Sequence, residues 1–396
     1  MSTTQLAAPP RAASDKGTYI YIAVYSSVLY TVLLIAPVIA GKLTAQFGLA
    51  PTQLGLLFSL ELGAFSLATV PAYLWLTKLD LRTATYLFTG IVIAGNLVSG
   101  FLDSFALLVV ARVVTSLAAG SITVILLTLS GKTANPSRAF GIFVVFQLAM
   151  GALVLAVFPT IYADTSVAAI YWTLAALAVA CLPVVRMIDG KALRREVATR
   201  PEGGAVRRMP MGKFAIGLAA VFLFYISLSG VWTFMAAISS GAGIDLSASS
   251  MVLSVATVAG IVSALVATVL GDSPRRREFL LAGYLGMAAS VVLLFGAPGV
   301  ARFAVAAVVF KFAWTFILPY LLSSLSNLSS GGQVMNSTNL MIGSGFAVGP
   351  YVSGVLIGSS GGFDEMLVLA TVGVLLSMAC VMVIHSSRAA VQGEVR

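Results

Sequence analysis

Apolar runs of about 20 residues recur along this chain from Tyr19 to His385, and they constrain its fold more than any other feature. Each run is long enough to cross the hydrocarbon core of a bilayer as an α-helix. Only 9% of the 396 residues are charged, against about 25% in soluble domains. The period-two alternation typical of a membrane β-barrel is absent. The sequence therefore predicts an all-α membrane protein.

Clusters of Gly, Pro and charged residues divide the chain into twelve expected transmembrane helices. The first six are expected at 19–41, 52–76, 84–101, 105–128, 140–159 and 167–187. The second six are expected at 213–237, 247–270, 279–297, 301–325, 333–357 and 364–385. We interpret these as an N-terminal six-helix bundle (19–188) and a C-terminal six-helix bundle (213–386). A polar linker (189–212) joins them, and short tails (1–18 and 387–396) flank them.

The positions of the basic residues predict the orientation of these helices. With both termini in the cytoplasm, 19 of the 23 Lys and Arg residues fall in cytoplasmic segments. Only Lys42 and Arg302 fall on the other side, and Arg112 and Lys311 fall inside helices. This asymmetry follows the positive-inside rule and indicates an even number of spans. The net charge of +9 therefore orients a multi-pass protein of a bacterial-type inner membrane, and it does not indicate nucleic-acid binding.

Several kinds of site are not indicated. The two cysteines lie far apart in apolar segments and read as small hydrophobic residues, and the single histidine, His385, argues against a metal or histidine-based catalytic centre. No phosphate-binding Gly-x-x-x-x-Gly-Lys-Ser/Thr loop occurs. We therefore expect a protein that is not an enzyme, has no cofactor and uses a proton gradient as its energy source.

Two six-helix halves, a basic central loop and cytoplasmic termini resemble the major facilitator superfamily of secondary transporters, over the whole chain. The start of the second span, Pro51 to Leu57, and the segment Ala111 to Ser116 in the fourth are similar to the corresponding segments of that family. The resemblance implies alternating access, with the first, fourth, seventh and tenth helices around a central cavity.

The family's signature loop is only partly present. Asp80 and Arg82 follow the second span, and Asp272 and Arg276 follow the eighth, each without the signature's first glycine. The resemblance implies that such loops form a gate on the cytoplasmic side. The alternative is that they are ordinary basic loops that only set orientation.

Three ionisable side chains lie away from the ends of the spans: Glu61, Arg112 and Lys311. A charge at membrane depth costs about 3 kcal/mol or more, so each needs a partner, water or a function. Arg112 and Lys311 lie in the fourth and tenth spans, which correspond in the two halves. Two cations near one cavity would favour an anion between them.

Each of these residues has a second interpretation. Arg112 either contacts substrate or serves structure and proton handling, because the family often has an arginine here. Lys311 either binds substrate, snorkels to the interface, or pairs with an acid. Glu61 either carries the coupled proton or forms a static salt bridge to Arg112.

Polar and aromatic side chains on the expected cavity helices complete the candidate site. These are Tyr30, Gln147, Tyr225, Trp314, Asn336 and Asn339. Apolar walls with a few converging polar groups are typical of a small-molecule site. Aromatic residues are equally common at lipid-facing and interfacial positions.

We therefore expect a monomeric carrier that co-transports protons with a small organic anion, such as a monocarboxylate or an aromatic acid. One rival is a proton-driven exporter of drugs or metabolites, with Glu61 binding a cationic or neutral lipophile and Lys311 structural. The other is a membrane receptor or lipid-handling protein without transport activity.

Overall fold

The computed structural model describes residues 15–190, 211–270, 275–326 and 332–393, and within these ranges all regular secondary structure is helical. The first group contains α1 (Lys16–Leu29), α2 (Thr31–Phe47), α3 (Pro51–Leu67), α4 (Thr69–Trp75), α5 (Leu81–Ser99), α6 (Phe105–Lys132), α7 (Pro136–Tyr162), α8 (Val167–Cys181) and the 3-10 helix η1 (Leu182–Met187). The second group contains α10 (Met211–Gly241), α11 (Leu246–Leu270), α12 (Arg276–Val292), α13 (Val300–Ser326), α14 (Gly332–Ser360) and α15 (Asp364–Gly393).

Eleven helices in the described part of the chain are long and apolar enough to cross a membrane, so the protein is a multi-pass membrane protein. In this count α1 and α2 form one span, as do α3 and α4. The span expected at 279–297 falls on α12, which has 17 residues and ends at Val292. Gly296 and Ala297 then take positive φ angles of 63° and 50°, so the backbone turns before Pro298 and the helix cannot continue.

Local sequence signals set the helix ends. Asp80 caps α5 by accepting hydrogen bonds from the backbone N–H groups of Arg82 (3.0 Å) and Thr83 (3.3 Å). Asn135 caps α7 in the same way, and a proline follows it at the first helical position. Gly48 ends α2 in the left-handed conformation, which glycine adopts without strain. These caps satisfy backbone groups that a helix leaves open at its ends.

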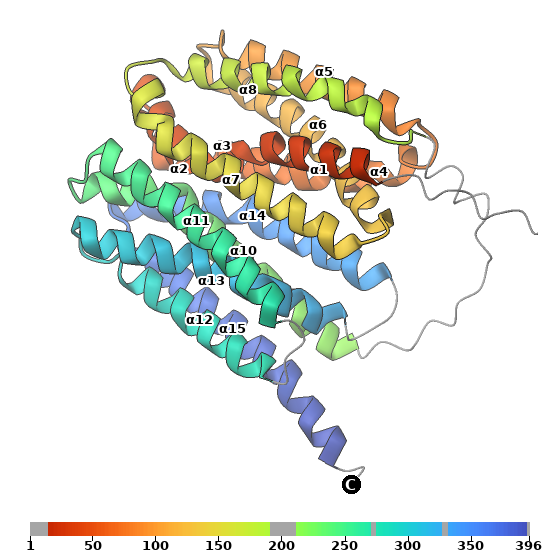
Figure 1. Cartoon of the computed structure of the whole chain (residues 1–396). Helices are drawn as coiled ribbons and strands as arrows, with labels where there is room; N and C mark the ends of the chain where they lie inside the picture. The colour runs from red at the N-terminus through yellow and green to blue at the C-terminus, as the bar shows by residue number, and fades with distance from the viewer. Residues whose placement is uncertain (1–14, 191–210, 271–274, 327–331, 394–396) are drawn as a thin grey trace, which may run out of the picture.

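The two groups of helices lie one above the other, with the first group in red to yellow-green and the second in green to blue (Figure 1). Three helix pairs connect them: α3 with α14, α7 with α11, and α2 with α10. The Ser254 hydroxyl of α11 donates to the Ala152 carbonyl of α7 at 2.7 Å. Across the third pair, the Trp232 indole of α10 donates to the Leu33 carbonyl of α2 at 3.2 Å.

Helices α3 and α14 run against each other through small residues. A Cβ atom at Gly55 would overlap the carbonyl oxygen of Pro350, and one at Gly343 would overlap the side chain of Ser66. The Ser59 hydroxyl accepts a hydrogen bond of 2.8 Å from the Tyr351 N–H. Small residues let membrane helices approach closely, and packing then replaces the hydrophobic effect as the main stabilising force. This pair therefore holds the two groups together along most of α3.

Candidate functional site

A buried ion pair joins α3 to α6. The Arg112 side chain donates from Nε (2.9 Å) and from a terminal guanidinium nitrogen (2.5 Å) to Oε1 of Glu61. Glu61 is 4% exposed and Arg112 is 2% exposed. Each charge therefore neutralises the other at membrane depth, where neither could remain alone without a large cost.

Neighbouring side chains extend this pair into a network. The Asn96 amide oxygen of α5 accepts a 2.7 Å hydrogen bond from the Arg112 guanidinium, and the Asn96 amide nitrogen donates to the Val92 carbonyl. The Ser116 hydroxyl lies 3.4 Å from Oε1 of Glu61. The Tyr171 ring lies 4.7 Å from the Arg112 guanidinium carbon, within range of a cation–π contact. Three helices of the first group thus hold Arg112 in one orientation.

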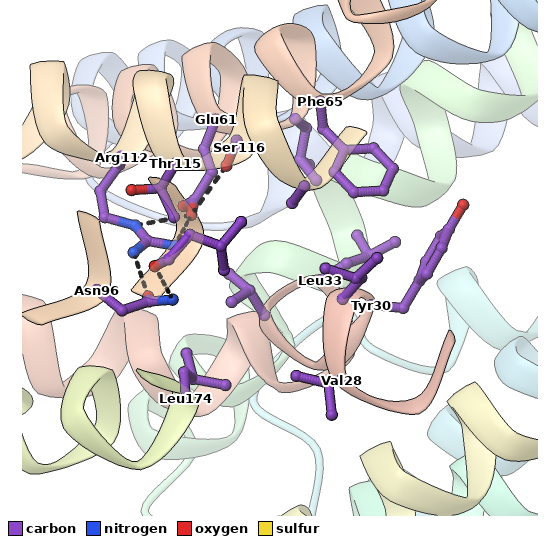
Figure 2. Close-up of a pocket in the computed structure, with 15 residues that line it drawn as sticks. Val28, Tyr30, Leu33, Glu61, Phe65, Asn96, Arg112, Thr115, Ser116 and Leu174 are labelled. Carbon is purple, nitrogen blue, oxygen red and sulfur yellow. Dashed lines mark hydrogen bonds and ion pairs between the residues drawn. The ribbon is translucent and has the colours of Figure 1, made fainter. Parts of the chain in front are cut away.

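A cavity of about 50 Å³ lies beside Glu61 and Arg112. Figure 2 shows Glu61, Arg112, Asn96 and Ser116 gathered at one end. One water molecule needs roughly 10–15 Å³ of such space, so the cavity has room for about three waters. All three donors to Glu61 reach Oε1, and within the described ranges Oε2 has no hydrogen-bond partner. The cavity is therefore too small for a solute but suits water and a proton that binds at Oε2.

A second cavity, of about 270 Å³, lies on the other side of Tyr30 and Phe65, which line both cavities. The Tyr30 hydroxyl points away from the charged network (Figure 2). The remaining lining residues come from α3, α4, α6 and the second group's α14, together with the turn after α4: Ser66, Thr69, Ala72, Leu76, Gly120, Thr123, Val124, Leu127, Thr128 and Asn339. Its volume is near the lower end for small-molecule sites, which begin at about 300 Å³.

The polar groups of this larger cavity are all neutral. None of the described residues that line it carries a charge. The side chains of Ser66, Thr69 and Asn339 make no hydrogen bond to any described residue, so their polar groups are available to a solute. The Thr123 and Thr128 hydroxyls donate to backbone carbonyls of α6, and Thr123 also pairs with the Tyr30 hydroxyl, so Thr128 keeps more acceptor capacity for a solute. The cavity therefore suits an uncharged solute that hydrogen-bonds.

Lys311 of α13 is 1% exposed and lies between two indole rings. Its Nζ atom is 4.0 Å from the centre of the Trp232 ring and 3.8 Å from that of the Trp314 ring. Among the described residues, no carboxylate lies within ion-pair distance of the Lys311 ammonium. The two ring faces stabilise the cation in place of an acid.

Aromatic rings continue from this lysine toward Tyr225 of α10. The Trp314 and Phe346 rings are 6.4 Å apart, and the Phe346 and Tyr225 rings are 4.9 Å apart. The structure thus connects Lys311, Trp314 and Tyr225 through one row of aromatic rings in the second group.

Gln147 of α7 has a buried side-chain oxygen, Oε1, without a hydrogen-bond partner among the described residues. Phe143 and Gly151, one helical turn to either side, pack against Tyr30 and Leu34. Gln147 therefore lies on the α7 face that meets the break between α1 and α2. An unpaired buried acceptor is costly, and a ligand or water that donates to it would remove this cost.

Asp80 and Arg82, two of the residues expected to form a cytoplasmic gate, make their hydrogen bonds within the first group of helices. Asp80 caps α5, and the Arg82 side chain donates from Nε to the Ile188 carbonyl at 2.7 Å, next to η1. Asp272 lies outside the described residues, and Arg276 begins α12 half-buried. Asn336 lies in α14.

Arg112 and Lys311 lie in different surroundings. Arg112 lines the small cavity in the first group, and Lys311 lies in the second group between its tryptophans. Across the described ranges, no cluster of three or more His, Cys, Asp or Glu residues is arranged to hold a metal ion.

Sequence reasoning missed Asn96 and Trp232, the residues that position the two cations. Asn96 was detectable as an amide within the apolar run 84–101, where an unpaired amide would be costly. Trp232 lies within 213–237 and carries no signal that separates it from a lipid-facing tryptophan.

Comparison with known proteins finds solved structures that are similar to this chain. The chain is similar in structure to a crystal structure described as nucleoside transporter NupG, with a TM-score of 0.69 and 12% sequence identity. A crystal structure of a point mutant of the same transporter gives a TM-score of 0.72 at 11% identity. Each match covers 93% of this chain and 99% of the other.

The chain has a transporter fold. At 11–12% identity these matches show a shared fold, as the resemblance noted in the sequence implied. Both similar structures are of a transporter, not of an enzyme. No protein-family model and no curated protein sequence matched the chain.

Proposed function

We propose that this protein is a proton-coupled secondary transporter of a small, uncharged solute with an aromatic ring, of the nucleoside or nucleobase type. The observation that carries the proposal is the 270 Å³ cavity, whose described lining offers the rings of Tyr30 and Phe65 and only neutral hydrogen-bonding groups. An aromatic ring can stack on such side chains, while amides and hydroxyls bind neutral polar edges. The likeness to NupG, described as a nucleoside transporter, supports the same solute class.

Of the two cations expected to bind an anion, Arg112 is already bound to other side chains. Arg112 was expected to hold a carboxylate together with Lys311, yet its guanidinium already binds Glu61 and Asn96. An anion at Arg112 would have to displace the Glu61 carboxylate. We therefore assign Arg112 to the ion pair and no longer favour it as a substrate contact.

Glu61 is the proposed proton carrier. It is the one acid that lines the small cavity, and its Oε2 atom is left open by the donors that bind Oε1. A proton on Oε2 would weaken the pair with Arg112 and so alter the packing of α3 on α6. Because α3 also packs on α14, this change would reach the contact between the two groups of helices.

The contact between α2 and α10 and the position of the 270 Å³ cavity favour an inward-facing state. We propose twelve spans in two six-helix bundles, both termini in the cytoplasm, and a bacterial-type inner membrane. In that orientation the α2–α10 contact at Leu33 and Trp232 lies on the outer side of the centre. The larger cavity extends toward Leu76 and Thr128, near the cytoplasmic ends of α4 and α6.

An organic anion is the second candidate, because the Lys311 ammonium has no acid partner in the described part of the chain. A carboxylate could approach it from the aromatic row that includes Trp314 and Tyr225. The two candidates differ in the residue that each requires.

A thermal-shift experiment with purified protein separates the two candidates. Uridine and benzoate serve as the neutral and anionic ring compounds, and tetraphenylphosphonium as the cation of the efflux alternative. A ligand that binds the folded state raises the unfolding temperature by mass action. We expect stabilisation by uridine that is reduced in Thr69→Val. Stabilisation by benzoate alone, lost in Lys311→Met, would reject the neutral-solute proposal in favour of the anion.

A further inference from the structure

Helix α2 contains a backbone carbonyl without its usual partner. In an α-helix the carbonyl of residue i accepts a hydrogen bond from the N–H of residue i+4. For Leu33 that residue is Pro37, inside α2, and proline has no N–H. A carbonyl left open at membrane depth is strongly unfavourable unless another donor reaches it.

A side chain from the other group of helices supplies that donor. The Trp232 indole N–H of α10 donates to the Leu33 carbonyl at 3.2 Å, and Trp232 is 1% exposed. Leu33 also lines the small cavity beside Glu61 and Arg112. The bond thus reaches from the second group to the edge of the proton site.

The same indole holds Lys311. Its ring centre lies 4.0 Å from Nζ of Lys311, and its ring meets that of Trp314 at a centroid distance of 6.0 Å. Trp314 also contacts Lys311 but makes no hydrogen bond to the described residues. Trp232 alone of the two therefore connects the cation to the opposite group.

We propose that Trp232 is a positioning residue that connects the Lys311 site to the contact between the two groups of helices, through the carbonyl that Pro37 leaves open. A solute or charge change that moves Lys311 displaces the indole ring. Displacement of the ring breaks the bond to Leu33 and loosens α2 from α10. Release of this bond then favours separation of the two groups on that side.

The bond can be tested directly by indole hydrogen exchange. The chain has four tryptophans, so ¹⁵N-tryptophan labelling in nanodiscs gives four indole signals, and Trp232→Phe assigns the relevant one. In Pro37→Ala the new backbone N–H competes for the Leu33 carbonyl. We expect the Trp232 indole to exchange with D₂O about 2- to 10-fold faster in that variant, as the loss of one net hydrogen bond predicts. An unchanged exchange rate would overturn the proposal.

A spin-label pair tests the connection to Lys311. Labels at Thr44 of α2 and Ser240 of α10, both exposed, report the separation of these helices after replacement of Cys181 and Cys380. We expect Trp232→Phe, Pro37→Ala and Lys311→Met each to populate longer distances. Trp314→Phe is the matched control and should broaden the distribution less than Trp232→Phe, because it removes a ring from Lys311 but no bond to α2.

The combination of two variants completes the test. Pro37→Ala and Trp232→Phe act on one bond, so the double variant should broaden the distances no more than either single variant. Additive broadening would contradict the proposal, as would equal effects of Trp232→Phe and Trp314→Phe. Neither readout requires solute transport, so a negative result here leaves the proposed transport activity untouched.

Discussion

Arg112 of α6 donates two hydrogen bonds to a single carboxylate oxygen of Glu61 on α3, and both side chains are almost fully buried. The pair converts two charges that the membrane would not tolerate singly into a neutral unit. It also leaves the second Glu61 oxygen facing a cavity with room for about three waters. The consequences for stability and for coupling can be measured separately.

Arg112→Met should destabilise the protein strongly. The substitution leaves the Glu61 carboxylate buried without its partner, which typically costs about 3–5 kcal/mol. Thermal unfolding in detergent should show a lowered midpoint temperature. The double variant Glu61→Gln with Arg112→Met removes both charges and should recover most of this loss. If the double variant were as unstable as the single one, the pair would not be the source of the stability.

Glu61→Gln should separate solute movement from proton movement. The amide cannot carry a proton, so an inward acid gradient should no longer stimulate net uptake. Counterflow exchange of solute at equal pH on both sides requires only binding and reorientation, and we expect it to persist. Counterflow also serves as the folding control. Gradient-stimulated uptake by this variant would exclude Glu61 as the proton carrier.

Substitutions in the larger cavity should weaken solute binding. Thr69→Val, Ser66→Ala and Asn339→Leu each remove one free polar group, worth about 1 kcal/mol or roughly fivefold in affinity. Titration calorimetry with uridine measures the change in Kd. Leu127→Met lines the same cavity without a polar change and is the matched control. Equal affinities in all four variants would place the solute elsewhere.

Two glycines with different surroundings test the contact between α3 and α14. Gly55→Ala places a Cβ atom against the Pro350 carbonyl, and overpacking of this kind costs about 1–3 kcal/mol. Gly90→Ala, on α5, meets no atom within 4 Å and should be tolerated. Thermal unfolding compares the two variants. A similar midpoint temperature for both would show that α3 and α14 adapt without strain.

The helical architecture was largely predictable, because a bilayer requires long apolar helices and each leaves a visible run in the sequence. The run at 279–297 was the exception. It contains the backbone turn at Gly296 and Ala297, so α12 stops at Val292. Apolar composition alone does not reveal such a turn within a run.

The candidate site was predictable where charge was the signal. Glu61, Arg112 and Lys311 stood out because a charge in an apolar run requires a reason. The pairing of Glu61 with Arg112 was one of the two interpretations that the sequence left open, whereas Asn96 and Trp232 did not stand out. Trp232 and Leu33 are 199 residues apart and meet only because α10 packs on α2. The sequence left open whether Glu61 binds Arg112, and the choice between a neutral and an anionic solute depends on that pair.

Net uptake into proteoliposomes tests the central claim most directly. Vesicles containing the purified protein are given radiolabelled uridine outside, with and without an inward acid gradient. The account predicts accumulation above that of empty vesicles, stimulation by the gradient, and competition by unlabelled nucleosides but not by benzoate. Absence of uridine uptake, together with gradient-driven uptake of benzoate, would contradict it.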